Sequence, residues 1–370
     1  MSGSPWGGSE ELWSQTAVRL RETGHDVVAS VPYWPSLSPR ITSLAGKGIK
    51  LNAHRSAQSP FIARKWHSAM RKLGQKAGEF RWLQRQAPDL VVISQGAIGD
   101  GMEWLKFCLE KKLPFVAISH CNTESWWPDD GAVAGMAEAF SAARKLFCVS
   151  RTNLALLERQ LSVRLSNAEI VDNPCNVSPE HPVAWPVETG ILRLACVARL
   201  DPVAKGQDVL FQVLARPPWR ERAIEVNLYG TGPFAQTLQR LAGYLHLEKV
   251  QFRGHVNDVA AIWALNHLLV LPSRYEGRPL GLVEAMWSGR PSVVTDVGGN
   301  AELCVHGETG FVAAAPVAGI FEQTMERAWD RRAEWRKMGE AARLRAEQML
   351  TRDPIGHFSR RLISCAGAGP

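Results

Sequence analysis

The sequence contains two series of short apolar segments, each bounded by turn residues or by a helical pattern. The first series covers residues 27–31, 90–94, 115–119 and 145–149. The second covers residues 192–197, 224–229, 250–252, 268–271 and 292–295. Segments of this length and character are typical of parallel strands that helices cover on both faces. The pattern predicts an α/β protein with two doubly wound parallel sheets.

A polar stretch at residues 173–190, which contains four prolines, separates the two series and is the expected linker. A chain of 370 residues is also too long for one ordinary hydrophobic core. We therefore expect one domain at residues 1–178, a second at residues 188–348, and a C-terminal segment at residues 349–370. This last segment is expected to cross back to the first domain as a helix.

Composition agrees with a folded protein, with 45% hydrophobic and 21% charged residues. No apolar run approaches the roughly 20 residues that span a bilayer, and residues 1–6 lack the apolar core of a signal peptide. We therefore expect a cytoplasmic protein. The seven cysteines are never spaced as Cys-x-x-Cys, which predicts free, mostly buried thiols and no zinc site.

One segment, residues 272–286, reads PSRYEGRPLGLVEAM and places Glu276 and Glu284 eight residues apart. Its glycines and prolines interrupt a helix, so Glu276 is expected on a loop and Glu284 on a helix that opens near Leu280. The unpaired N–H groups at such a helix start favour an anion, for example a diphosphate. The two carboxylates can then hold hydroxyl groups on either side. The segment therefore predicts a site for a phosphorylated sugar.

This segment resembles the Glu-x7-Glu signature of family 4 glycosyltransferases, which are retaining enzymes of the GT-B fold. The similarity continues through residues 289–302 (GRPSVVTDVGGNAE) and includes residues 198–206 (ARLDPVAKG) and 7–10 (GGSE). The resemblance implies two Rossmann-like domains that face each other across a cleft. The first would be the acceptor side, and the second would bind the nucleotide sugar.

The resemblance also assigns roles to four charged residues. Glu276 resembles the carboxylate that holds donor-sugar hydroxyls near the anomeric carbon, and Glu284 resembles the one that accepts hydrogen bonds from the ribose. Arg199 and Lys205 match the spacing of the clamp that stabilises a departing diphosphate. The alternative for all four is an ordinary solvated charge on a loop or helix.

The implied donor site includes seven further residues, of which the first two let a donor phosphate approach their backbone. They are Gly7, Gly8, Gly277, Pro279, Leu280, Gly281 and Leu282. Alternatively, the first glycine pair only makes the turn before a helix that Ser9 caps and that ends at Gly24. Glu302 also has two interpretations. It is either part of the family motif or an acid that stabilises a helix dipole.

His120 follows the apolar segment at residues 115–119, where it resembles the family's active-site histidine beside donor sugar and acceptor. A structural histidine is the alternative. Trp126 and Trp127 lie among polar residues shortly after it. They are either core residues or stacking surfaces for an acceptor sugar.

A Rossmann-like half normally opens with a buried strand of about five residues. Here Met1 leads directly into the loop at residues 2–8. We therefore expect that the first strand is missing and that the natural product begins upstream. The unpaired neighbouring strands would weaken the first domain.

Positive charge is concentrated at residues 61–86, which carry seven Lys or Arg residues against one Glu, interleaved with apolar side chains. Such a segment can bind an anionic membrane surface peripherally or attract an acidic acceptor. A solvated basic face is the alternative. Nucleic acid is a poorer candidate, because no binding motif accompanies the charge.

The resulting prediction is a glycosyltransferase that moves a sugar from a nucleotide sugar to a hydroxyl acceptor with retention, without a metal or other cofactor. The acceptor is a glycan, a glycolipid or a small molecule. The residues expected to act on the reacting groups are His120, Glu276, Arg199 and Lys205. The alternatives are a nucleotide-sugar epimerase or hydrolase, or a catalytically silent scaffold of the same fold.

Overall fold

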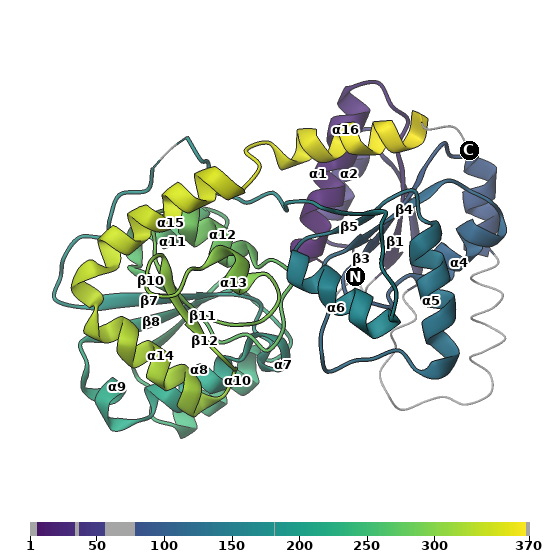
Figure 1. Ribbon diagram of the computed structural model, residues 1–370. Helices are drawn as coiled ribbons and strands as arrows, with labels where there is room; N and C mark the ends of the chain where they lie inside the picture. The colour runs from purple at the N-terminus through teal and green to yellow at the C-terminus, as the bar shows by residue number, and fades with distance from the viewer. Residues whose placement is uncertain (1–5, 34–36, 56–77, 181, 368–370) are drawn as a thin grey trace.

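The computed structural model describes residues 6–33, 37–55, 78–180 and 182–367. It has two lobes, side by side and joined by two chain crossings (Figure 1). The elements of the N-terminal lobe are α1 (Gly8–Glu22), β1 (Val28–Tyr33), α2 (Pro39–Gly46), β2 (Lys50–Arg55), a helix over residues 78–86, β3 (Val91–Gln95), α4 (Met102–Glu110), β4 (Phe115–Ser119), α5 (Asp130–Ala142), β5 (Leu146–Cys148), α6 (Arg151–Leu161) and β6 (Ala168–Ile170).

The described strands of this lobe form two parallel sheets, not the single sheet expected from the first series. Strands β3, β4, β5 and β6 pair in that order, and β1 pairs with β2. The β1–β2 pair has an apolar cluster of its own, in which Ala17 of α1 and Ile41 and Leu44 of α2 cover the strands. The predicted missing first strand concerns residues before Gly7, most of which lie outside the described residues, so it stays a prediction.

The C-terminal lobe contains β7 (Leu192–Val197), α7 (Pro202–Lys205), α8 (Gln207–Leu214), α9 (Pro217–Glu221), β8 (Ile224–Tyr229), α10 (Ala235–Tyr244), β9 (Val250–Gly254), α11 (Val259–Leu265), β10 (Leu268–Leu271), α12 (Leu280–Trp287), β11 (Ser292–Thr295), α13 (Asn300–Leu303), β12 (Gly310–Ala313), α14 (Ala318–Asp330), a 3-10 turn (Arg332–Glu334) and α15 (Trp335–Met349). All six strands are parallel, in the order β12-β11-β10-β7-β8-β9. This is the doubly wound order, whose direction reverses between β7 and β10. Ligands of such sheets bind beyond the carboxyl ends of the strands at this reversal.

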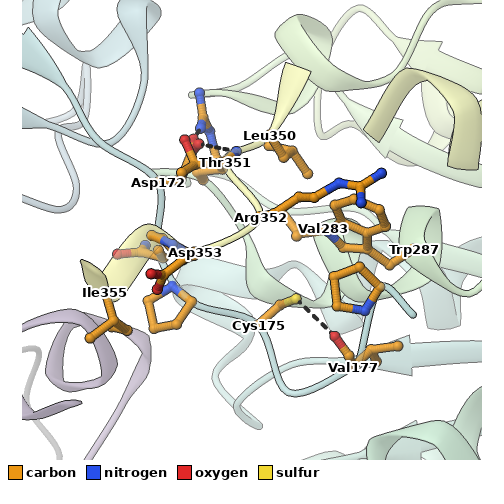
Figure 2. Close-up of a pocket in the computed structure, with 15 residues that line it drawn as sticks. Asp172, Cys175, Val177, Val283, Trp287, Leu350, Thr351, Arg352, Asp353 and Ile355 are labelled. Atoms are coloured by element: carbon orange, nitrogen blue, oxygen red, sulfur yellow. Dashed lines mark hydrogen bonds and ion pairs between the residues drawn. The ribbon is translucent and has the colours of Figure 1, made fainter. Parts of the chain in front are cut away.

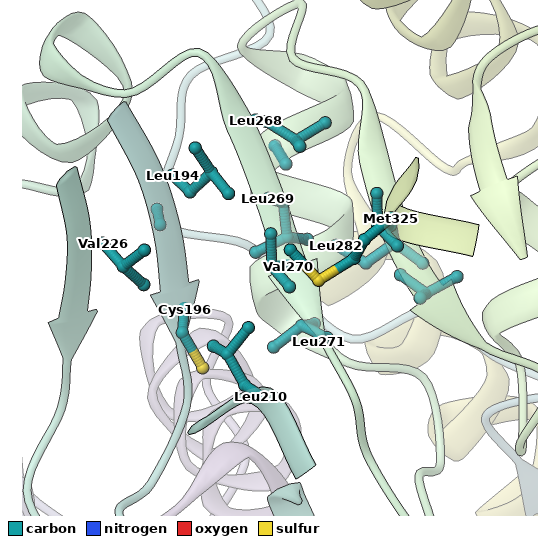
Figure 3. Close-up of a cluster of buried hydrophobic side chains, with 14 of the residues drawn as sticks. Leu194, Cys196, Leu210, Val226, Leu268, Leu269, Val270, Leu271, Leu282 and Met325 are labelled. Atoms are coloured by element: carbon teal, nitrogen blue, oxygen red, sulfur yellow. The ribbon is translucent and has the colours of Figure 1, made fainter. Parts of the chain in front are cut away.

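The core of this sheet is apolar because helices cover it (Figure 3). Leu194 of β7, Val226 of β8 and Val270 of β10 are fully buried, and Leu282 of α12 and Met325 of α14 pack in the same cluster. Helix α12 is therefore anchored by its apolar residues, which fixes the position of its first turn above the sheet edge.

Helix α16 (Pro354–Gly367) follows the second crossing and lies on the N-terminal lobe beside α1 (Figure 1). The ring of Phe358 meets Phe147 edge-on with centroids 5.0 Å apart. Arg361 donates to both carboxylate oxygens of Glu169, at 2.7 and 2.6 Å. We propose that residues 1–178 and 188–348 are the two domains and that the C-terminal segment stabilises the first.

Three other expectations concern the whole chain. All seven cysteines are free and five are buried, which confirms the prediction of free, mostly buried thiols. No helix within the described residues is long and apolar enough to cross a membrane. The basic segment at residues 61–86 lies outside the described residues except for its last part, residues 78–86, which is helical.

Candidate functional site

Two loops meet where the strand order of the C-terminal sheet reverses, one after β7 and one after β10. The backbone N–H groups of Arg274 and Tyr275 both donate to the carbonyl oxygen of Ala204, at 2.8 and 3.4 Å. Gly206 has a φ of +64°, and a Cβ there would lie 2.0 Å from the carbonyl oxygen of Pro272. Only glycine fits this contact, so the two loops are held together by the backbone itself.

This contact brings Lys205 and Glu276 together, although 71 residues separate them in the sequence. The Lys205 ammonium donates to both carboxylate oxygens of Glu276 at 2.7 Å, and the Ser273 hydroxyl donates to Oε1 at 2.8 Å. The Glu276 side chain is 5% exposed, so this pair neutralises a carboxylate that would otherwise be buried alone. Ser273 was not among the predicted site residues.

Arg199 lies in the loop between β7 and α7, the short helix that ends at Lys205, and its guanidinium donates to Asp201 at 2.6 Å. Gln207 fixes the loop by donating to the carbonyl oxygen of Arg199 at 2.8 Å. Sequence reasoning missed Asp201, although its place two residues after a predicted cation was visible. The carboxylate orients the guanidinium that would face an anion.

Helix α12 begins at Leu280, as predicted, and no side chain caps its N-terminus. A Cβ on Gly281 would lie 2.8 Å from the carbonyl oxygen of Val197, so the helix start packs against the end of β7. Glu284 is 3% exposed and burial raises its pKa. Its Oε1 accepts from the amide and backbone nitrogens of Asn176, at 3.1 and 3.4 Å. Glu284 is therefore not a solvated surface residue.

Helix α1 begins at Gly8, with Gly7 as its N-cap residue and no side-chain cap. The expected Ser9 cap is wrong, because Ser9 lies inside the helix and Gly7 is the N-cap residue. The expected helix end is confirmed, because Gly24 follows the C-cap residue Thr23 with a φ of +92°, and the N–H groups of Gly24 and His25 donate to the carbonyl oxygens of Arg21 and Leu20. A Cβ on Gly8 would lie 3.4 Å from Leu280, the first residue of α12. Two helix starts without side-chain caps thus lie next to each other. Their free N–H groups and dipoles make a favourable anion site.

His120 follows β4 at the carboxyl end of the N-terminal sheet and is 5% exposed. Neither ring nitrogen has a hydrogen-bond partner within the described residues. A Cβ on Gly277 would lie only 1.7 Å from the carbonyl oxygen of His120, so the two lobes touch here. Burial lowers the pKa of the imidazole to about 3. The ring is therefore neutral near pH 7, and both of its nitrogens are buried.

We expect His120 to make the protein less stable as the pH falls from 6.5 toward 3. Its pKa is about 3 in the folded chain, against an ordinary value of 6.5, so the unfolded chain binds the proton more readily in this window. The resulting loss in unfolding free energy is at most about 1.4 kcal/mol per pH unit. Denaturant titrations at several pH values, compared between the wild type and His120→Gln, measure it. An His120 proton resonance that titrates near pH 6.5 would contradict this prediction.

For Glu302, Trp126 and Trp127 the structure decides between the two interpretations given above. Glu302 lies in α13 and its Oε1 accepts from the backbone and hydroxyl of Thr152 in the other lobe, at 2.7 and 2.8 Å. Glu302 therefore joins the two lobes and does more than stabilise the dipole of its own helix. Trp126 and Trp127 are 38% and 57% exposed, so neither is a core residue. Stacking against an acceptor sugar stays a prediction.

A cavity of about 190 Å³ lies elsewhere, between the two chain crossings and beside α12 (Figure 2). Its walls come from the first crossing, from Val283 and Trp287 of α12, and from residues 350–355. None of the predicted donor or catalytic residues lines it. We therefore place the candidate site at the facing sheet edges and not in this cavity.

Two family models match the chain, one in each lobe. Residues 6–178 match the model described as glycosyltransferase family 4, and residues 192–330 match the one described as glycosyl transferases group 1. Together they include most of the chain and every predicted site residue.

Curated relatives match the chain over part of its length. The D-rhamnosyltransferase WbpZ of Pseudomonas aeruginosa is 32% identical over 131 residues, which are 34% of each chain. The N-acetyl-alpha-D-glucosaminyl L-malate synthase of Bacillus anthracis is 37% identical over 118 residues, 31% of each chain. The matched part thus spans about a third of the length of these curated relatives.

Solved structures match over nearly the whole chain. Anabaena Alr3699/HepE in complex with UDP-glucose has a TM-score of 0.74 and 19% identity, covering 98% of this chain and 97% of that chain. The lipopolysaccharide outer core galactosyltransferase WaaB has a TM-score of 0.68 and 19% identity, with the same coverage. These likenesses confirm the predicted fold class, two Rossmann-like parallel-sheet domains in the GT-B arrangement.

Proposed function

This chain belongs to the group 1 and family 4 glycosyltransferases, and we propose that it transfers a sugar from a nucleotide-sugar donor to a hydroxyl acceptor with retention at the anomeric carbon. One observation carries the proposal. The Lys205–Glu276 pair lies at the reversal point of the C-terminal sheet, on the same edge as the start of α12. Cations, free N–H groups and a buried carboxylate are the groups that a sugar diphosphate needs.

The diphosphate is proposed to bind between the starts of α1 and α12, with Arg199 and Lys205 as its counter-charges. Negative charge grows on the diphosphate as the bond to the sugar breaks. Cations and oriented N–H groups placed there in advance stabilise that charge without reorganising. The backbone contacts of residues 7–8 and 277–282 belong to this part of the site, because Gly8 meets Leu280.

The nucleotide ribose is proposed to bind Glu284, whose carboxylate is already buried and oriented by Asn176. The transferred sugar is proposed to bind Glu276 and the neutral ring of His120. An imidazole without a positive charge can donate through one nitrogen and accept through the other. It therefore suits a sugar hydroxyl better than it suits the diphosphate.

For the reaction itself, we propose that the acceptor hydroxyl attacks from the face that the diphosphate leaves. The bond from the acceptor oxygen to the anomeric carbon forms as the bond from that carbon to the phosphate oxygen breaks. The acceptor proton passes to the departing diphosphate. This route needs no covalent sugar–protein intermediate, and the family resemblance supports it.

The first test is thermal stabilisation by a panel of UDP, GDP and ADP and their sugars. UDP-glucose is a suitable starting ligand because it is bound in the structure of the Anabaena relative. A ligand at 100 times its dissociation constant adds about 2.7 kcal/mol to the unfolding free energy. Absence of a shift with every nucleotide would contradict the donor site, and consumption of the donor without an acceptor would indicate a hydrolase or epimerase.

Glu284→Gln is expected to weaken binding of the preferred nucleotide about tenfold or more, because a hydrogen bond to a charged group contributes about 1.5–3 kcal/mol. Glutamine keeps the side-chain oxygen that accepts from Asn176, so the fold should persist. Glu322→Gln is the matched control, since Glu322 of α14 pairs with Arg216 and this pair lies away from the site. Equal affinity in Glu284→Gln and wild type would exclude the ribose role.

A further inference from the structure

The first turn of α6 contacts two segments of the C-terminal lobe, helix α13 and the loop after β10. Thr152 donates to Glu302, as described above, and the side-chain amide of Asn153 donates to the backbone carbonyl oxygen of Glu276 at 3.0 Å. The α6 start is therefore a docking point for the loop that carries the sugar-binding carboxylate.

Asn153 is 2% exposed, and both ends of its amide are engaged. Its nitrogen donates to Glu276 and also to the Ser150 hydroxyl at 2.9 Å. Its oxygen accepts from the backbone N–H of Asn122 at 3.1 Å. Because Asn122 lies two residues after His120, one side chain bridges the donor loop and the segment that follows β4.

The bridge continues through two more buried amides. Asn122 donates to the side-chain oxygen of Gln160 at 2.7 Å. Gln160 donates to the carbonyl oxygens of Thr123 and Trp126, at 3.0 and 2.7 Å. Asn122 and Gln160 are each 3% exposed. A buried amide that loses its partner costs more than the bond itself contributes, so these groups tend to keep one arrangement.

We propose that Asn153 is a positioning residue that holds the Glu276 backbone in register with the segment at residues 120–127. Through this amide chain, the carboxylate that faces the donor sugar and the loop that carries the exposed tryptophans keep a fixed relative position. The inference rests on the proposed function, because the orientation of Glu276 matters only if Glu276 binds the sugar.

The test compares two ligands that differ only in the sugar. Asn153→Asp replaces the donor nitrogen with an oxygen that repels the Glu276 carbonyl, while keeping an acceptor for Asn122. We expect UDP to bind as in the wild type, because its contacts are with other residues. UDP-glucose, or the sugar of whichever nucleotide the panel selects, is expected to bind about fivefold or more weakly, the effect of one hydrogen bond.

Asn167→Asp is the matched control. The Asn167 amide donates to the carbonyl oxygens of Phe140 and Ala143, at 2.9 and 2.7 Å, both within the N-terminal lobe. Its loss should lower the melting temperature without changing the ratio of UDP to UDP-glucose affinity. If Asn153→Asp does not fold, Asn153→Ala removes the donor without adding a charge and is expected to shift the same ratio.

Two results would overturn the inference. One is a wild-type affinity ratio in a folded Asn153 variant, and the other is an equal change of the ratio in Asn167→Asp. Failure of the proposed function looks different, because the wild type itself would then bind neither UDP nor any other nucleotide of the panel.

Discussion

Replacing Gly277 with alanine is expected to lower sugar transfer at least about a hundredfold while both lobes stay folded. A Cβ at this position would lie 1.7 Å from the carbonyl oxygen of His120 and 3.0 Å from a methyl group of Val149. Its φ is not positive, so the alanine backbone is unstrained and the clash is entirely between lobes. The lobes must separate by an ångström or more, and a misplacement of about 1 Å can cost about a hundredfold in rate.

Release of nucleoside diphosphate measures this effect, and thermal unfolding shows whether the fold persists. Binding of the nucleotide alone should weaken less than turnover, since Arg199, Lys205 and Glu284 all lie in the C-terminal lobe and only the start of α1 contacts the diphosphate from the other lobe. Gly243→Ala is the control, because no atom lies within 4 Å of a Cβ there and α10 continues through it. If turnover of Gly277→Ala stays within about threefold of the wild type, the close contact of the lobes is not needed for the reaction. That result would contradict this prediction.

Removing Lys205 is expected to reduce both turnover and stability, and a second substitution separates the two. Lys205→Met leaves the Glu276 carboxylate, which is 5% exposed, with only the Ser273 hydroxyl as a described partner near its charge. Breaking a buried ion pair in this way typically costs about 3–5 kcal/mol. In Lys205→Met with Glu276→Gln no buried charge is left alone, so most of the lost stability should return.

Turnover should not return in the double variant, because the cation that faces the diphosphate is still absent and the carboxylate proposed to hold the sugar is also replaced. Removing one such electrostatic group typically lowers the rate about 10²- to 10³-fold. Chemical denaturation and donor turnover of the wild type, both single variants and the double variant complete the cycle. Recovery of turnover together with stability would mean that the two charges only neutralise each other and that neither acts on the donor.

The sequence predicted the buried strands well because a strand covered on both faces must be apolar along its length. β4, β7, β8, β10 and β11 have the predicted bounds. The strands β2, β6 and β12 were missed. β6 is three residues long and only partly buried, and β2 (KLNAHR) contains several polar residues, so neither has the apolar run of a central strand.

The motif spacing also indicated which residues share the candidate site, because residues that follow neighbouring parallel strands meet at one sheet edge. It could not show that Lys205 pairs with Glu276, since that contact depends on how two loops pack. Nor could it reveal Asn153, whose role arises from a side chain that reaches across the lobe boundary. A polar residue in the first turn of a helix has many other uses.

The sequence by itself determined the α/β class of the two lobes, and it predicted a linker between them and a phosphate-type site at the start of α12. These follow from local patterns, namely apolar runs, prolines and a glycine-interrupted helix start. The tertiary structure alone decided that His120 is buried and neutral, that Glu284 is buried, and that Gly277 contacts the other lobe. Burial and interdomain contact depend on residues far apart in the chain, and no local pattern encodes the distance between them.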